Sequence, residues 1–376
     1  MSVFKKSLCF FISAIVLTGF LANLVPVSAL SVSAKSAILI DASSQTALYE
    51  KNSKEKLPMA STTKIMTAVI ALEGFDPDEA VSIPAEAVGI EGSSVYLCAG
   101  ERLTLRQLVY ALMLSSANDA ATAIAIYCSG SIEAFAEKMN VKAKEIGLDS
   151  THFDNPHGLD SPSHYTTAYD LARLTAYAIK NPEFKEIVST YKAEIPLGES
   201  NNARLLVNHN KLLRSYDGAI GVKTGFTKKS GRCLVSAAER NGTILISVTL
   251  NAPDDWRDHT AMLDYGFKNY VSEKLTLDQK HLSVPIISGT ESSVPCSLLS
   301  EPTALLPKDH EKVSCRIEMS RFEYAPVAKG EILGKARYFC DGREIASADI
   351  VALKSVELKK QKHTIWDKII YFFKNL

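Results

Sequence analysis

The chain has 376 residues, of which 46% are hydrophobic and 22% are charged, and both fractions are typical of soluble globular domains. This length is enough for two domains with a sizeable core. Lysine plus arginine equals aspartate plus glutamate at 42 each. The sequence therefore lacks the basic excess that nucleic-acid binding requires, and we expect no nucleic-acid partner.

Residues 1–29 are predicted to be a secretory signal rather than part of the fold. Two lysines precede an apolar run that covers about residues 8–25. Small residues then offer two cleavage ends, after Ala29 and after Ala34, and the first is favoured because it lies closer to the apolar run. A retained membrane anchor is the alternative, since the run is long enough to span a bilayer.

Residues 30–275 are predicted to form an α+β domain. Apolar runs at 37–41 and 46–50 are typical of a hairpin. Helices with one apolar face follow, starting near Pro58, after the capping box at Thr104, across 135–146 and after a second capping box at Thr167. Strands come late, at 222–225, 233–237 and 244–250. This order predicts one antiparallel sheet with helices packed on it, in which the first and last strands meet.

The pattern changes at residue 276. Short alternating runs with turn signals continue to residue 358 and predict a small all-β C-terminal domain. In residues 359–376, lysines precede apolar positions that fall on one side of a helix, among them Trp366 and Phe373. This segment is too short to span a bilayer. We expect an amphipathic helix in the membrane interface, and a helix packed on its own domain is the alternative.

Cysteine and histidine form no metal-ligand pattern. The seven cysteines include no C-x-x-C pair, so free thiols are expected rather than a zinc site. His152, His157 and His164 lie close together in the sequence but lack H-E-x-x-H spacing. We expect these histidines to be structural, and we predict neither a metal nor another cofactor.

Three short motifs can carry chemistry, and the first is Ser61-Thr62-Thr63-Lys64. Positions three apart on a helix share a face, so Ser61 and Lys64 are expected side by side. A serine hydroxyl needs a base to take its proton, and a lysine can be that base if burial or nearby positive charge lowers its pKa. Taken alone, a capped helix with a solvated lysine explains the spacing equally well.

The second motif is Ser116-Ala117-Asn118, which follows the helix that begins after Thr104. In an extended loop, Ser116 and Asn118 would both point into a cleft. The hydroxyl could then relay a proton to a leaving amine, and the amide could hold a substrate carbonyl. Simple helix capping by Asn118 or Asp119 is the alternative.

The third motif, Lys223-Thr224-Gly225, lies on a predicted strand. The lysine can meet a substrate's terminal carboxylate, and the threonine can donate a second hydrogen bond. The glycine lets a substrate backbone approach closely. An exposed lysine on an edge strand is the alternative explanation.

Together, the order and spacing of the motifs resemble those of the low-molecular-mass penicillin-binding proteins that act as D-alanyl-D-alanine carboxypeptidases. The similarity covers nearly the whole mature chain, including Ser36–Asp41, Asn155–Leu159 and Asn208–Leu213. The chain departs from the family at Ala117, where glycine is more common. The resemblance implies a β-lactamase/transpeptidase-like catalytic domain.

The resemblance also implies acyl transfer in two steps. Ser61 would be the acylated nucleophile, Lys64 its general base, and Ser116 an assistant in proton transfer. The remaining site residues implied by the family are Asn118, Lys223, Thr224 and Gly225 for substrate binding, with the backbone N–H groups of Ser61 and Phe226 as the oxyanion hole.

The expected substrate is a peptidoglycan stem peptide ending in D-Ala-D-Ala, and β-lactams are expected as covalent inhibitors. The enzyme would be exported and held on the outer face of the cytoplasmic membrane by its terminal helix. A class A β-lactamase is less favoured because no glutamate occurs between Thr151 and Asp170. A D,D-endopeptidase with the same residues stays open. A non-catalytic peptidoglycan-binding module is disfavoured by the complete motif set.

Overall fold

The computed structural model describes residues 30–198, 202–277 and 282–360. The predicted signal and nearly all of the predicted terminal helix lie outside these residues. Within the described part of the chain, no helix is long and apolar enough to cross a membrane. The cysteines of the described part are free thiols, as the sequence predicts.

A five-stranded antiparallel sheet organises the first unit, in the order β2-β1-β9-β8-β7. Its strands are β1 (Ser36–Asp41), β2 (Ala47–Lys51), β7 (Ala219–Thr227), β8 (Gly231–Arg240) and β9 (Thr243–Leu250). Strand β1 pairs with β9 from Ser36 opposite Leu250 to Asp41 opposite Leu245. The predicted meeting of the first and last strands is therefore confirmed.

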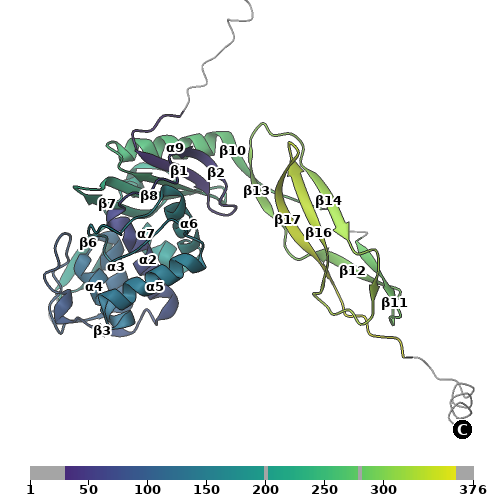
Figure 1. The fold of residues 1–376 in the computed structure, drawn as a ribbon, viewed down its shortest axis with the longest axis horizontal. Coiled ribbons are helices and arrows are strands. Elements are labelled where there is room, and N and C mark those ends of the chain that lie inside the picture. Colours follow the sequence, from purple (N-terminus) through teal and green to yellow (C-terminus); the bar gives the residue numbers. More distant parts are fainter. Residues whose placement is uncertain (1–29, 199–201, 278–281, 361–376) are drawn as a thin grey trace, which may run out of the picture.

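Helices cover both faces of this sheet (Figure 1). Ile38 and Ile40 join the large core beneath the helices of the middle of the chain, while Leu39 points to the opposite core, which includes Met262 of α9. The helices are α2 (Lys64–Gly74), α3 (Leu105–Leu114), α4 (Asn118–Ser129), α5 (Ile132–Glu145), α6 (Ala168–Ala178), α7 (Pro182–Ser189), α8 (Leu212–Ser215) and α9 (Asp255–Asn269), with 3₁₀ turns η1 (Ala60–Thr63) and η2 (Ala85–Ala87).

One predicted helix start and one predicted capping box differ from the structure. The helix expected from Pro58 begins only at Lys64, because η1 precedes it with Ala60 at a positive φ of 47°. The capping box at Thr104 is confirmed. Thr167 caps α6 through the Asp170 N–H, but the Asp170 carboxylate does not return the bond, since it accepts from the loop at 150–151 instead.

Two short hairpins flank the helices and were not predicted. They are β3 (Ala80–Ser82) with β4 (Arg102–Thr104), and β5 (Lys192–Pro196) with β6 (Ala203–Val207). Their strands are short or mostly exposed, so they lack the buried alternating pattern on which strand prediction depends.

The C-terminal part is all-β, as predicted. A six-stranded sheet has the order β14-β16-β17-β12-β11-β15, and its own hydrophobic cluster runs from Leu275 to Val356. Its strands are β11 (Ser283–Ile287), β12 (Ser293–Leu298), β14 (Ser314–Met319), β15 (Glu323–Tyr324), β16 (Ile332–Cys340) and β17 (Arg343–Ala352). Strand β10 (Tyr270–Lys274) pairs with β13 (Thr303–Pro307), so the pairing crosses the predicted domain boundary at residue 276. The boundary itself stays a prediction.

The segment before β1 is part of the packed structure. Val32 and Ala34 are buried, and the Lys51 ammonium donates to the Val32 carbonyl at 2.8 Å. The Asp258 carboxylate, on α9, accepts from the Ser33 N–H and hydroxyl, each at 2.8 Å, and from the Ala34 N–H at 3.0 Å. These contacts anchor residues 32–34 to the sheet and to α9.

A chain that begins at Lys35 should therefore be less stable than one that begins at Leu30. The shorter chain loses a buried valine side chain, worth about 1.5–3 kcal/mol, and leaves a buried carboxylate without its donors, which costs about 1–3 kcal/mol more. Urea unfolding of the two chains measures the difference, and equal midpoints would contradict the anchoring role.

Candidate active site

Ser61 and Lys64 lie together although they do not share one α-helix. Ser61 is on η1, and Lys64 is the first residue of α2. The Lys64 Nζ lies 2.9 Å from the Ser61 Oγ. The same nitrogen donates to the Asn118 Oδ1 at 2.7 Å and to the His157 carbonyl at 2.6 Å. Lys64 is 0% exposed, and these three oxygens are the hydrogen-bond partners of its amine among the described residues.

The surroundings of Lys64 favour its neutral form. Burial lowers the pKa of its amine well below 10.5, and the positive charge of Lys223 lowers it further, against the opposing effect of Asp119. A neutral amine has one lone pair, which accepts a hydrogen bond from a donor. The Ser61 hydroxyl is the only one of the three partners able to donate, because the other two are carbonyl oxygens. The geometry thus directs the lone pair at the serine proton.

The third motif lies at the edge of the sheet next to η1. Lys223 is 1% exposed on β7, its Nζ donates to the Thr224 carbonyl at 3.1 Å, and burial lowers its pKa to about 7. A Cβ at Gly225 would lie 3.1 Å from the Ser61 N and 3.2 Å from the Met59 carbonyl. Glycine therefore lets β7 approach the backbone that carries Ser61.

A cleft of about 460 Å³ opens where these elements meet. Five of the predicted site residues line it, and Lys64, Asn118 and Lys223 lie behind its wall. Its lining residues are Ser61, Ser93, Ser116, His209, Thr224, Gly225, Phe226, Arg232, Asp255 and Trp256. No motif marks four of the lining residues, which were not predicted: Ser93, Arg232, Asp255 and Trp256. His209 lies in the segment 208–213 that resembles the family, but it was assigned no role.

The second motif does not form the extended loop expected of it. Ser116 has a positive φ of 59°, which is uncommon for a serine and is the kind of strain that gathers at functional sites. Asn118 is the first residue of α4. Its amide nitrogen donates to the Glu91 carbonyl at 2.5 Å, and its oxygen accepts from Lys64. One amide hydrogen remains for a substrate.

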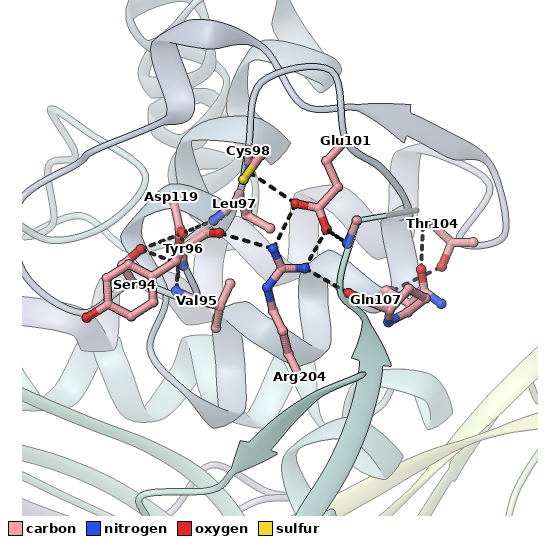
Figure 2. A network of polar contacts seen from close by, with 12 residues as sticks. Ser94, Val95, Tyr96, Leu97, Cys98, Glu101, Thr104, Gln107, Asp119 and Arg204 are labelled. Atoms are coloured by element: carbon pink, nitrogen blue, oxygen red, sulfur yellow. Dashed lines mark hydrogen bonds and ion pairs between the residues drawn. The ribbon is translucent and has the colours of Figure 1, made fainter. Parts of the chain in front are cut away.

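A loop at residues 91–101 is hydrogen-bonded to Asn118 and to the next residue, Asp119, whose bonds Figure 2 shows. The Asn118 N–H donates to the Ser93 carbonyl at 2.7 Å. The fully buried Asp119 carboxylate accepts from the Ser94 hydroxyl at 2.6 Å and from the Leu97 N–H at 3.0 Å. Because Ser93 lines the cleft, these bonds fix one of its walls.

A buried ion pair holds the other end of the loop, as Figure 2 shows. Arg204 on β6 binds the Glu101 carboxylate through both terminal nitrogens, and their side chains are 8% and 2% exposed. Arg204 also donates to the Tyr96 carbonyl at 3.0 Å. The partners are 103 positions apart in the sequence, and sequence reasoning had no signal for this pair.

The predicted structural histidine His164 supports the turn before Ser61. Its Nδ1 accepts from the Asp154 N–H, so its Nε2 carries the proton and donates to the Thr63 Oγ1 at 2.7 Å. The Thr63 hydroxyl in turn donates to the Ala60 carbonyl at 2.8 Å. Burial lowers the pKa of His164 to about 4, so the imidazole stays neutral and this chain of bonds persists at neutral pH.

The acids between Thr151 and Asp170 all have structural partners. Asp154 accepts from the Ser163 hydroxyl at 2.8 Å and Asp160 from the Thr227 hydroxyl at 3.0 Å. Asp170 accepts from the Ser150 N–H. This arrangement agrees with the absence of a glutamate base that a class A β-lactamase would need.

In the parts of the chain that the structure describes, no group of three or more His, Cys, Asp or Glu side chains could hold a metal ion.

The comparison with protein families decides the classification. The model of the D-alanyl-D-alanine carboxypeptidase family matches residues 23–254. This chain belongs to that family. A second model, the C-terminal domain of penicillin-binding protein 5, matches residues 271–358, and both matches agree with the resemblance drawn from the three motifs.

Individual members of the family are similar over most of their length. D-alanyl-D-alanine carboxypeptidase DacF of Bacillus subtilis is 34% identical over 88% of this chain and 87% of its own. DacA of Haemophilus influenzae is 30% identical over 95% and 98%. The crystal structure of penicillin-binding protein 5 from Haemophilus influenzae matches with a TM-score of 0.76 at 30% identity, covering 88% of this chain and 99% of the other.

Replacing Arg204 by alanine should slow acylation although Arg204 does not line the cleft. Glu101 would be left buried and unpaired, which costs about 3–5 kcal/mol, and the loop that carries Ser93 would shift. A displacement of this kind reduces rate by about 10- to 100-fold. The measurement is the second-order rate of labelling by a fluorescent penicillin. Arg337→Ala, which removes an exposed ion pair of the β domain, is the matched control. An unchanged rate in folded Arg204→Ala protein would exclude a role for the loop.

Proposed function

We propose that this chain is a serine-type D-Ala-D-Ala carboxypeptidase that removes the terminal D-alanine from peptidoglycan stem pentapeptides. The observation that carries the proposal is the buried Lys64 amine 2.9 Å from the Ser61 hydroxyl. A lysine without its proton in contact with a serine at the mouth of a cleft is a nucleophile paired with its base. Family membership supports the same chemistry.

In the first step, Ser61 loses its proton to the Lys64 Nζ, and its oxygen bonds to the carbonyl carbon between the two D-alanines. The backbone N–H groups of Ser61 and Phe226 stabilise the oxyanion. The bond from carbon to nitrogen then breaks, and the proton passes from Lys64 by way of Ser116 to the leaving amine. In the second step, water gives a proton to the base as its oxygen bonds to the acyl carbon. The bond from that carbon to the Ser61 oxygen then breaks, the base returns the proton to Ser61, and the shortened peptide leaves.

The substrate's terminal carboxylate is assigned to the third motif. Lys223 supplies positive charge and Thr224 a hydroxyl, with Gly225 leaving room for the peptide backbone, while Asn118 orients the substrate through its remaining amide hydrogen. Lys223 is buried with a pKa of about 7. A carboxylate that binds beside it favours the protonated amine and forms an ion pair that is shielded from water.

We also propose that the protein is exported, with cleavage after Ala29, and that residues 359–376 anchor it to the outer face of the cytoplasmic membrane. Cleavage after Ala34 would remove Val32 and Ser33, which are bound to the sheet and to Asp258. The predicted β domain, 276–358, would hold the catalytic domain away from the lipid surface.

The test is D-alanine release from a short peptide ending in Lys-D-Ala-D-Ala by the chain that begins at Leu30. We expect release by the parent and by Ser129→Ala, a control on α4 outside the cleft, and a loss of at least about 10⁴-fold in Ser61→Ala. If no protein releases D-alanine while the parent still labels covalently with penicillin, the nucleophile stands and the D,D-endopeptidase becomes the better assignment. Release by Ser61→Ala would overturn the proposal.

A further inference from the structure

Strand β11 lies at the end of the β domain farthest from α9 and β10 (Figure 1). Exposed apolar side chains lie at the end of this strand and on β15, which pairs with it. Ile287 at the end of β11 is 39% exposed, Phe322 is 48% exposed, and Tyr324 on β15 is 65% exposed. Large apolar side chains gathered on one surface are uncommon on soluble proteins unless that surface binds something. We call these three residues the tip patch.

Strand pairing explains why the three side chains share a face. Ile287 lies opposite Tyr324 in the parallel pairing of β11 with β15, and paired residues of neighbouring strands point to the same side. Phe322 precedes Tyr324 by two positions, and their rings meet edge to face with centroids 5.7 Å apart. Ile286 points the other way and is buried in the domain core, so the tip patch faces outward.

The chain leaves the β domain beside this patch. The Lys359 N–H donates to the carbonyl of Ser288, the residue after Ile287, at 2.8 Å, and Leu358 bridges to Gly289. Residues 361–376 therefore start next to the tip patch, and their sequence is the predicted interfacial helix with Trp366 and Phe373.

Basic residues adjoin the tip patch in the sequence and occur at the chain exit. Arg321, Lys359 and Lys360 are exposed, next to the tip patch in sequence or at the chain exit. Glu323 alternates with Phe322 and Tyr324 along β15 and so points away from the patch face, while Glu357 is the acid nearest the exit in the sequence. Aromatic residues flanked by lysine and arginine match the interface of a bilayer with anionic headgroups.

We propose that the tip patch inserts into the headgroup region of an anionic bilayer as a second membrane contact beside the terminal helix. The inference rests on the proposed membrane location. A single weak interfacial contact binds reversibly, and two contacts on one chain bind far more firmly because the second is effectively intramolecular. Two contacts also limit rotation of the β domain about the chain exit, which one terminal helix alone would permit.

Vesicle binding by the chain that begins at Leu30 tests the proposal. The triple variant Ile287→Ser, Phe322→Ser and Tyr324→Ser should bind phosphatidylglycerol-containing vesicles about tenfold more weakly than the parent. The control triple, Val88→Ser, Val141→Ser and Leu205→Ser, removes similarly exposed apolar side chains from the catalytic part and should bind like the parent. D-alanine release in solution and the melting temperature verify that both triples are folded.

The depth of the patch gives a second readout that loss of folding does not affect. In a background with Trp256→Phe and Trp366→Phe, the variant Phe322→Trp carries the one indole of the chain. Lipids brominated near the headgroup should quench its fluorescence when the protein is bound, and Leu205→Trp in the same background should not be quenched. The tip patch is not a membrane contact if the indole at position 322 stays unquenched in bound protein, or if the tip triple binds as firmly as the parent. Either result leaves the proposed terminal anchor intact. A parent that does not bind overturns both.

Discussion

The site depends on one lysine amine that is held without water beside a serine. Lys64 is enclosed by the sheet edge, α4 and the loop at 155–159, and three oxygens surround its nitrogen. Removing a lysine from water disfavours its charge, and the charge of Lys223 adds to that effect. Folding of the catalytic part therefore keeps the Lys64 amine neutral. An exposed lysine would be protonated at neutral pH and could not act as a base.

Much of the surrounding structure serves to fix the backbone next to that amine. Gly158 has a φ of +88°, and a Cβ there would lie 2.0 Å from the Ala60 carbonyl, so only glycine fits against the turn before Ser61. The same carbonyl accepts from Thr63, and Asp119 and Arg204 hold the loop across the cleft. Ser116, with its positive φ, lines the same cleft. The geometry of the site thus depends largely on groups that do not line the cleft.

The sequence predicted the sheet, the central helices and the all-β character of the C-terminal part, because each rests on local periodicity. The three motifs identified the residues that the fold brings together at Ser61. The features that the sequence could not predict depend on tertiary contacts. They are the 3₁₀ turn that displaces the start of α2, the left-handed backbone of Ser116, and the Arg204–Glu101 pair. Each of these is set by groups distant in the sequence, and no periodic pattern encodes them.

The pH dependence of kcat/KM for D-alanine release tests the account most directly. Lys64 acts without its proton, so the rate should rise as pH passes its lowered pKa; Lys223 acts with its proton, so the rate should fall above its pKa of about 7. Burial and the charge on Lys223 both lower the pKa of Lys64, so its rising limb and the falling limb of Lys223 together give a bell-shaped profile. Lys223→Arg should move only the falling limb to higher pH. A rising limb near pH 10, the value of an ordinary lysine, would contradict a neutral Lys64 as the base.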